Sequence, residues 1–301
     1  MLKVAWADSY CHSLPEGHRF PMEKYTLLPE QLLYEGTLEN DNFFRPDVPE
    51  DDLIFSTVHS EEYIKKLNEL TLSRSEERKT GFPLSEELVI REKQIIQGSV
   101  DATMYALKYG CAMNIAGGTH HAFTDRGEGF CLLNDIAVSA QYLIDQHHFE
   151  KILIVDLDVH QGNGTAEIFR GNKDVFTFSM HGKNNYPLHK EKSDLDIELA
   201  DGTGDNIYLD ILDNYLGQLI EKHEPQFIFF QSGVDVLKTD KLGRLGLSVN
   251  GCKERDRKVL ESCKINDIPV MISMGGGYSE DIKLIIEAHA NTYRLAQELF
   301  F

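Results

Sequence analysis

The chain has 301 residues, 42% hydrophobic and 26% charged, which is typical of a folded protein and excludes a disordered one. Its net charge of −19 at pH 7 opposes approach to a phosphate backbone, so we expect no nucleic-acid partner, although the same charge can attract a lysine-rich tail. The five cysteines form no CxxC pair, so neither a disulfide framework nor a thiolate zinc site is expected. No apolar run has the length of a signal peptide or membrane span, and we expect a cytoplasmic protein with no membrane span.

Short apolar runs alternate with helix-length segments along the chain. Each run is apolar on both faces, as strands of a parallel sheet between helix layers are. The predicted strands are residues 112–116, 152–155, 175–180, 227–230 and 270–274. The predicted helices are residues 134–148, which Asn134 is expected to cap, 206–223, 252–265 and 279–300. This alternation predicts a three-layer α/β/α fold with an open, mainly parallel central sheet, and residues 1–301 are expected to form a single domain.

Ligands of such sheets bind beyond the carboxyl ends of the strands. In KILIVDLDVHQGNG, a strand leads into Asp156, Asp158 and His160. Residues two apart in an extended chain point to the same face, so these three side chains are expected to converge. Buried carboxylates require hydrogen bonds or a cation, and a histidine–carboxylate set suits zinc. For one aspartate alone, hydrogen bonding to backbone groups would be the better interpretation.

Three further strand ends carry reactive side chains. PQFIFFQSGVD presents Asp235 as a third metal ligand, and AMNIAGGTHHAF places His120 and His121 after two glycines. Adjacent imidazoles beside a metal can divide general-base and electrostatic roles. VMISMGGGY ends in Tyr278, which the glycines can aim at a ligand, although a packed tyrosine or a phosphate nest is equally compatible with this motif alone.

Six ordered motifs, GGTHHAF, GFCLLND, VDLDVHQGNGTAEIF, VFTFSMH, SGVD and MGGGY, resemble those of the zinc-dependent histone deacetylase superfamily. The resemblance extends from about residue 15 to residue 280, and HQGN and SMHGKNNYP are most similar to the class IV branch and bacterial histone deacetylase-like proteins. It implies an arginase/deacetylase-like fold. It also implies an amidohydrolase that removes acetyl or longer fatty acyl groups from the ε-amino group of lysine in a protein or peptide.

The resemblance implies a role for each candidate residue. Asp158, His160 and Asp235 become the ligands of one catalytic zinc ion, whereas Asp156 becomes the residue that orients His120. A structural potassium ion is implied as well, and its ligands are Asp156, Asp158, His160, Ser179 and Met180, partly through backbone carbonyls.

The resemblance also implies how catalysis and substrate binding take place. Zinc and Tyr278 polarise the amide carbonyl, while His121 takes a proton from the attacking water and gives it to the leaving amine. His120 acts mainly through its charge. The implied substrate-binding residues are Gly129, Phe130, Tyr186 and Gly276.

Two departures from the family pattern matter. Asn163 stands where many members have an aspartate beside the second histidine, so the pKa of His121 is expected to be lower than in those relatives. Residues 80–83 offer no obvious aspartate to hold the substrate backbone, so peptide recognition is expected to be loose or dominated by the acyl group.

The sequence leaves several alternatives open. A ureohydrolase would need a second metal and further carboxylate clusters. A small acylated amine such as an acetylpolyamine remains possible as substrate, as does an inactive acyl-lysine-binding protein. Acyl length, oligomeric state and the choice between zinc and iron are undecided.

Overall fold

The computed structural model describes residues 1–301, and its eight strands form one sheet in the order β2-β1-β3-β8-β7-β4-β5-β6. All neighbouring strands are parallel, which confirms and sharpens the predicted mainly parallel sheet. The strands are β1 (Lys3–Ala5), β2 (Phe43–Phe44), β3 (Cys111–Asn114), β4 (Ile152–Asp156), β5 (Val175–Gly182), β6 (Leu195–Leu199), β7 (Phe227–Gln231) and β8 (Val270–Ser273).

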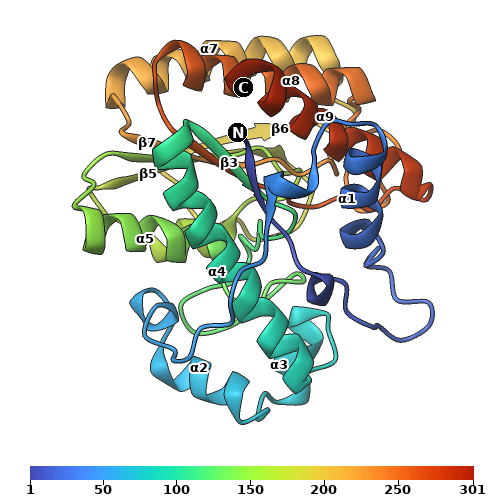
Figure 1. The fold of residues 1–301 in the computed structure, drawn as a ribbon, viewed down its shortest axis with the longest axis vertical. Helices are drawn as coiled ribbons and strands as arrows, with labels where there is room; N and C mark the ends of the chain where they lie inside the picture. The colour runs from blue at the N-terminus through green and yellow to red at the C-terminus, as the bar shows by residue number, and fades with distance from the viewer.

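Helices cover both faces of this sheet. They are α1 (Lys24–Tyr34), α2 (Glu61–Asn68), α3 (Arg74–Thr80), α4 (Glu86–Tyr109), α5 (Asp135–His147), α6 (Asn163–Ile168), α7 (Asp205–His223), α8 (Val249–Ile265) and α9 (Ile282–Phe300). Helices α7, α8, α9 and α1 pack side by side on one face, and α4 and α5 pack together on the other (Figure 1). Every residue of β4 and β7 is buried, as expected for strands between two helix layers. None of the helices is both long enough and apolar enough to cross a membrane.

The predicted strands and helices are all present, with ends that differ by a few residues. Asn134 caps α5 by accepting a hydrogen bond from the Ala137 amide at 3.0 Å, as predicted. Strands β1, β2 and β6 were not predicted. The first two contain three and two residues, and β6 is a half-exposed edge strand, LDIEL, without an apolar run.

A row of buried polar residues crosses the carboxyl edge of the sheet. Cross-strand pairing aligns the residues that form this row, namely Asn114, Ser273, Gln231, Asp156 and Ser179. The loops that follow β3, β8, β7 and β4 therefore start side by side. Topology alone thus brings together four loops that are distant in the sequence.

Candidate active site

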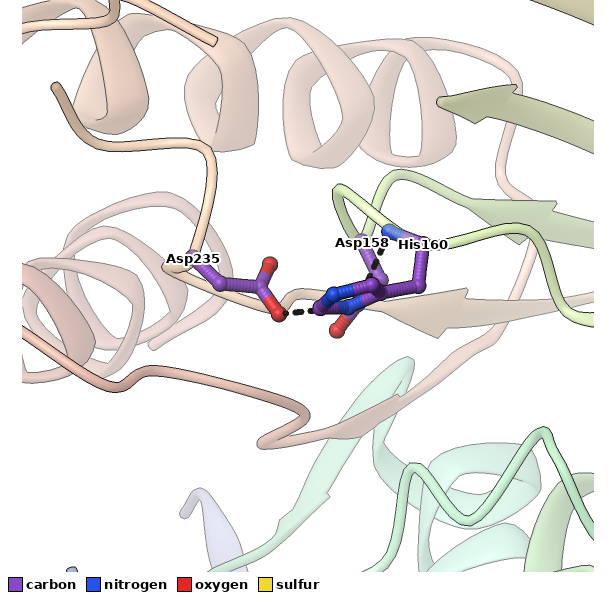
Figure 2. A group of neighbouring side chains, drawn as sticks. All are labelled: Asp158, His160 and Asp235. Carbon is purple, nitrogen blue, oxygen red and sulfur yellow. Dashed lines mark hydrogen bonds and ion pairs between the residues drawn. The ribbon is translucent and has the colours of Figure 1, made fainter. Parts of the chain in front are cut away.

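The three predicted metal ligands meet at this edge of the sheet. The ligand atoms of Asp158, His160 and Asp235 all lie within 4.8 Å of one another, and all three residues are buried (Figure 2). Nδ1 of His160 lies 3.0 Å from Oδ1 of Asp158 and 3.2 Å from Oδ2 of Asp235. Oδ2 of Asp235 accepts no hydrogen bond. A buried carboxylate oxygen without a hydrogen bond is costly, and a bound cation would compensate for it.

Charge within this cluster also suits a cation. Burial and the charge of Asp158 raise the pKa of Asp235 to about 7. Burial would lower the pKa of His160, but its close contacts with both carboxylates raise it to about 10. The imidazole is therefore the only positive group directly between two carboxylates, and a divalent ion can replace its proton. Two carboxylates and one histidine, with room for water or substrate, fit a catalytic zinc site.

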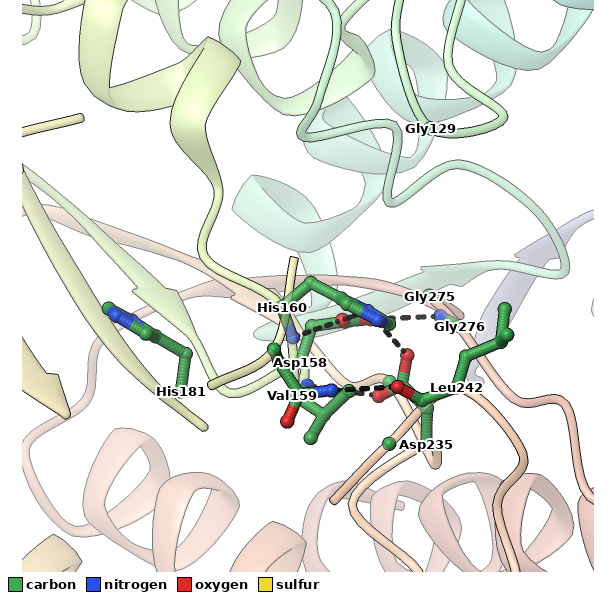
Figure 3. Close-up of polar contacts among 12 residues, drawn as sticks. Gly129, Asp158, Val159, His160, His181, Asp235, Leu242, Gly275 and Gly276 are labelled. Carbon is green, nitrogen blue, oxygen red and sulfur yellow. Dashed lines mark hydrogen bonds and ion pairs between the residues drawn. The ribbon is translucent and has the colours of Figure 1, made fainter. Parts of the chain in front are cut away.

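Backbone groups and glycines fix the two carboxylates. The Gly276 amide donates to Oδ2 of Asp158 at 3.1 Å, and the Val159 amide donates to Oδ1 of Asp235 at 3.0 Å (Figure 3). A Cβ at Gly276 would lie 2.2 Å from Oδ2 of Asp235, and one at Gly233 would lie 2.2 Å from Oδ2 of Asp158. Only glycine fits at either position without displacing a carboxylate.

The two adjacent histidines have different partners. His120 Nδ1 lies 2.7 Å from a carboxylate oxygen of Asp156, whereas His121 Nδ1 lies 2.6 Å from the amide oxygen of Asn163. Burial opposes charge on His120, but Asp156 raises its pKa to about 9. Burial, followed by the charges of His120 and His160, holds the pKa of His121 well below its usual range. The pair therefore places one cationic and one neutral imidazole side by side, with ring centroids 4.1 Å apart.

Two adjoining cavities give access to these groups. The outer cleft has a volume of about 520 Å³ and the inner cavity about 40 Å³. The residues that line both are His121, Gly129, Phe130, His160 and Tyr278. Of the other predicted substrate-binding residues, Tyr186 lines the outer cleft and Gly276 the inner cavity. The structure thus places every residue predicted to bind substrate on one continuous path to the cluster.

A model of the histone deacetylase domain matches residues 18–293. The chain belongs to the histone deacetylase family. It is 39% identical to an uncharacterised protein of Picosynechococcus sp., with 99% of each chain covered, and 29% identical to histone deacetylase 2 of Arabidopsis thaliana, with 95% of this chain and 76% of that protein covered. The crystal structure of an HDAC homolog from Aquifex aeolicus has a TM-score of 0.82 and 25% identity, and covers 99% of this chain and 83% of its own. The family and the fold support a deacetylase hydrolase.

Within this histone deacetylase fold, Asp240 positions Tyr278, a role that the sequence did not reveal. Its carboxylate accepts hydrogen bonds from the amides of Tyr278 at 2.6 Å and of Leu242 and Gly243 at 2.8 Å each. Burial raises the pKa of the Tyr278 phenol well above its usual range. The phenol therefore remains protonated and can donate a hydrogen bond into the cavity.

Two buried cations also escaped prediction, because lysine and arginine are rarely fully buried. Arg255 donates to the carbonyls of Gly233 at 2.6 Å and Leu157 at 3.1 Å, and so joins the two loops that carry Asp158 and Asp235. Lys24 donates to the Gly275 carbonyl at 3.1 Å. Both long side chains brace loops of the deacetylase site, and no local sequence signal marks either as buried.

Of the residues predicted to bind potassium, Asp158 and His160 also belong to the cluster of predicted metal ligands, whereas Asp156, Ser179 and Met180 lie in strands β4 and β5. Asp156 pairs with Ser179 across β4 and β5, and its Oδ1 accepts a hydrogen bond from the Asp158 amide at 3.1 Å. The backbone carbonyls of Asp158 and His160 accept no backbone hydrogen bond. His181, whose Nδ1 lies 2.9 Å from the Ser179 hydroxyl, sits apart from the cluster (Figure 3). Asp156 thus contacts His120 and the Asp158 amide, and it is not one of the three side chains that could hold a metal ion together.

Proposed function

We propose that this protein is a zinc-dependent lysine deacylase that hydrolyses the ε-amide of acyl-lysine in a protein or peptide. The observation that carries the proposal is the meeting of Asp158, His160 and Asp235 beside a path that His160, His121 and Tyr278 line. Ligand binding by a related fold supports it, since one HDAC homolog with a TM-score of 0.82 was solved in complex with SAHA.

Each side chain of the site has its own role in the proposed reaction. When bound, zinc would polarise the amide carbonyl and lower the pKa of water to about 7. Neutral His121 accepts a proton from the attacking water and returns it to the leaving amine. Tyr278 donates a hydrogen bond to the carbonyl oxygen as negative charge develops there. His120, paired with Asp156, supplies positive charge beside His121.

The size of the inner cavity favours a short acyl group. A lysine chain that enters from the outer cleft reaches His121 and Tyr278 first, so its acyl group would extend into the inner cavity. That cavity has a volume of about 40 Å³, little more than the roughly 30 Å³ that one water molecule occupies in the liquid, and the buried ion pair of Arg91 and Glu92 lies in its wall. We propose acetyl-lysine as the preferred substrate. A kcat/KM for a myristoyl-lysine peptide equal to or above that of its acetyl counterpart would contradict this preference.

A potassium ion is part of the proposal. Asp156 and Ser179, with the free carbonyls of Asp158 and His160 and the carbonyl of Met180, offer the oxygen ligands that a hard cation prefers. Such an ion would stabilise the end of β4 and would take no part in the chemical steps.

The Tyr278→Phe variant tests the assignment of roles. Loss of one oxyanion donor is expected to lower kcat by about 10²- to 10³-fold, with zinc content unchanged. Tyr34→Phe, a matched change at a side chain that is 92% exposed, should retain full activity. Full activity in Tyr278→Phe would remove this phenol from the mechanism. Zinc-loaded protein that binds acyl-lysine peptides without hydrolysing them would instead be an inactive binding protein.

A further inference from the structure

We infer that the mouth of the outer cleft selects acyl-lysines flanked by carboxylates, so that the substrate is an acidic peptide segment. This inference rests on the proposed deacylase function and defines its substrate class. Three segments form this mouth, namely the end of α3, the turn that contains Gly129 and Phe130, and the loop around His18. The inference follows from their contacts and from the charges that they carry.

Direct contacts hold the three segments together. The end of α3 pairs with the turn that forms the cleft wall, since the amides of Gly129 and Phe130 donate to the carbonyls of Lys79 at 2.9 Å and Thr80 at 2.7 Å. A Cβ on the following residue, Gly81, would lie 2.8 Å from the Phe130 ring. The end of α3 is therefore fixed against the wall of the cleft.

The third segment is the loop around His18. Its Nε2 lies 2.9 Å from the Gly81 carbonyl, and its ring stacks on Phe82 with centroids 5.7 Å apart. The next residue, Arg19, places its guanidinium carbon 5.1 Å from the centroid of the Phe130 ring. A cation is thus held over the aromatic wall that the substrate must pass.

The charges at this mouth are predominantly positive. Arg19, Arg78 and Lys79 line the cleft and are exposed, and none forms an ion pair. Glu128 is the one acidic residue of the lining. Its carboxylate is already engaged by the Arg126 guanidinium at 2.9 Å and the Tyr186 hydroxyl at 2.5 Å.

This local charge is opposite in sign to that of the whole chain, which is −19. Guanidinium groups recognise carboxylates through paired hydrogen bonds, and three unpaired cations can bind two or more. A lysine-rich tail or a polyamine would instead bring like charges to Arg19, Arg78 and Lys79, which disfavours encounter and binding. Any attraction of a lysine-rich tail by the net charge is therefore opposed at the point of substrate entry.

A set of acetyl-lysine peptides with aspartate, alanine or lysine on both sides tests the inference. Each surface ion pair changes affinity by up to about fivefold, so kcat/KM should be about tenfold higher for the aspartate peptide than for the lysine peptide at ~0.1 M salt. The difference should shrink at ~1 M salt, where the screening length falls to about 3 Å. Free ε-acetyl-lysine, compared with its carboxyl amide, shows whether a single α-carboxylate is enough.

The Arg78→Glu/Lys79→Glu variant should abolish or reverse the preference for the aspartate peptide. If that variant is unstable, Arg78→Gln/Lys79→Gln can replace it, because it removes the two positive charges without adding negative charge near the end of α3. It should reduce the preference for the aspartate peptide. Lys173→Glu/Lys222→Glu provides the matched control, because it makes the same change in net charge at two exposed lysines beyond the opposite edge of the sheet. In this control, the three peptides should keep the same order of kcat/KM as in the wild type.

The outcomes separate the two proposals. Equal kcat/KM for the three peptides, or the same change of order in the control variant, would overturn the inference while leaving the deacylase function intact. Failure to hydrolyse even the alanine peptide would overturn the deacylase function itself.

Discussion

The Asn163→Asp variant is expected to raise the pKa of His121. The wild-type contact joins His121 Nδ1 to Oδ1 of Asn163 at 2.6 Å between two buried side chains. The neighbouring His120–Asp156 pair provides an internal comparison, because there a carboxylate at 2.7 Å raises the pKa of an equally buried imidazole to about 9. A carboxylate at this distance changes a partner's pKa by roughly 1–3 units, or about 1.4–4 kcal/mol. Burial is the largest cause of the low pKa of His121.

The pH dependence of kcat/KM for a neutral acetyl-lysine peptide measures this change. A general base acts when deprotonated, so a higher pKa of His121 moves the acidic limb of the profile to higher pH by roughly 1–3 units. Asn172→Asp adds the same charge in the loop before β5, at the opposite edge of the sheet, and should leave the limb in place. An acidic limb that is identical in Asn163→Asp and wild type would refute the role assigned to this pair.

Other changes test the metal cluster. Gly276→Ala should lower zinc affinity at least about tenfold, because its Cβ would lie 2.2 Å from Oδ2 of Asp235. Gly217→Ala in α7 is the control and should bind zinc normally, because a Cβ there would have no atom within 4 Å. Zinc at 100 times its Kd should stabilise the wild type by about 2.7 kcal/mol, seen as a higher Tm, and should not stabilise Asp235→Asn. In metal-free protein the pKa of Asp235 is about 7, above its unfolded value of about 4, so the folded state binds the extra proton and stability falls as pH rises from about 4 to 7. Asp235→Asn should lose that part of the pH dependence, and an unchanged slope would argue against the charge arrangement described here.

The candidate site residues could be predicted from the sequence because they come shortly after the predicted strands. Asp158, His160 and Asp235 each come shortly after an apolar run, and parallel strands place those ends side by side. The same rule overstated the role of Asp156. Strand β4 ends at that residue, so the alternation of an extended chain does not continue to Asp158 and His160, and Asp156 turns toward His120.

The mouth of the cleft could not be predicted in the same way. His18, Arg19 and residues 78–82 lie far from any predicted strand, and their contact with Phe130 depends on loop conformation. Arg78 and Lys79 belong to a short polar helix that resembles an ordinary solvated surface. Lys24 and Arg255 were missed for a related reason, since their burial depends on carbonyl partners in distant loops.

Acetate release measured against bound zinc tests the central claim most directly. Metal-free protein is titrated with zinc, and hydrolysis of a neutral acetyl-lysine peptide is followed together with metal content. Activity should rise in proportion to zinc and saturate at one ion per chain, with no zinc-dependent activity in Asp235→Asn. Saturation at two ions, or no hydrolysis at full zinc occupancy, would contradict the central claim.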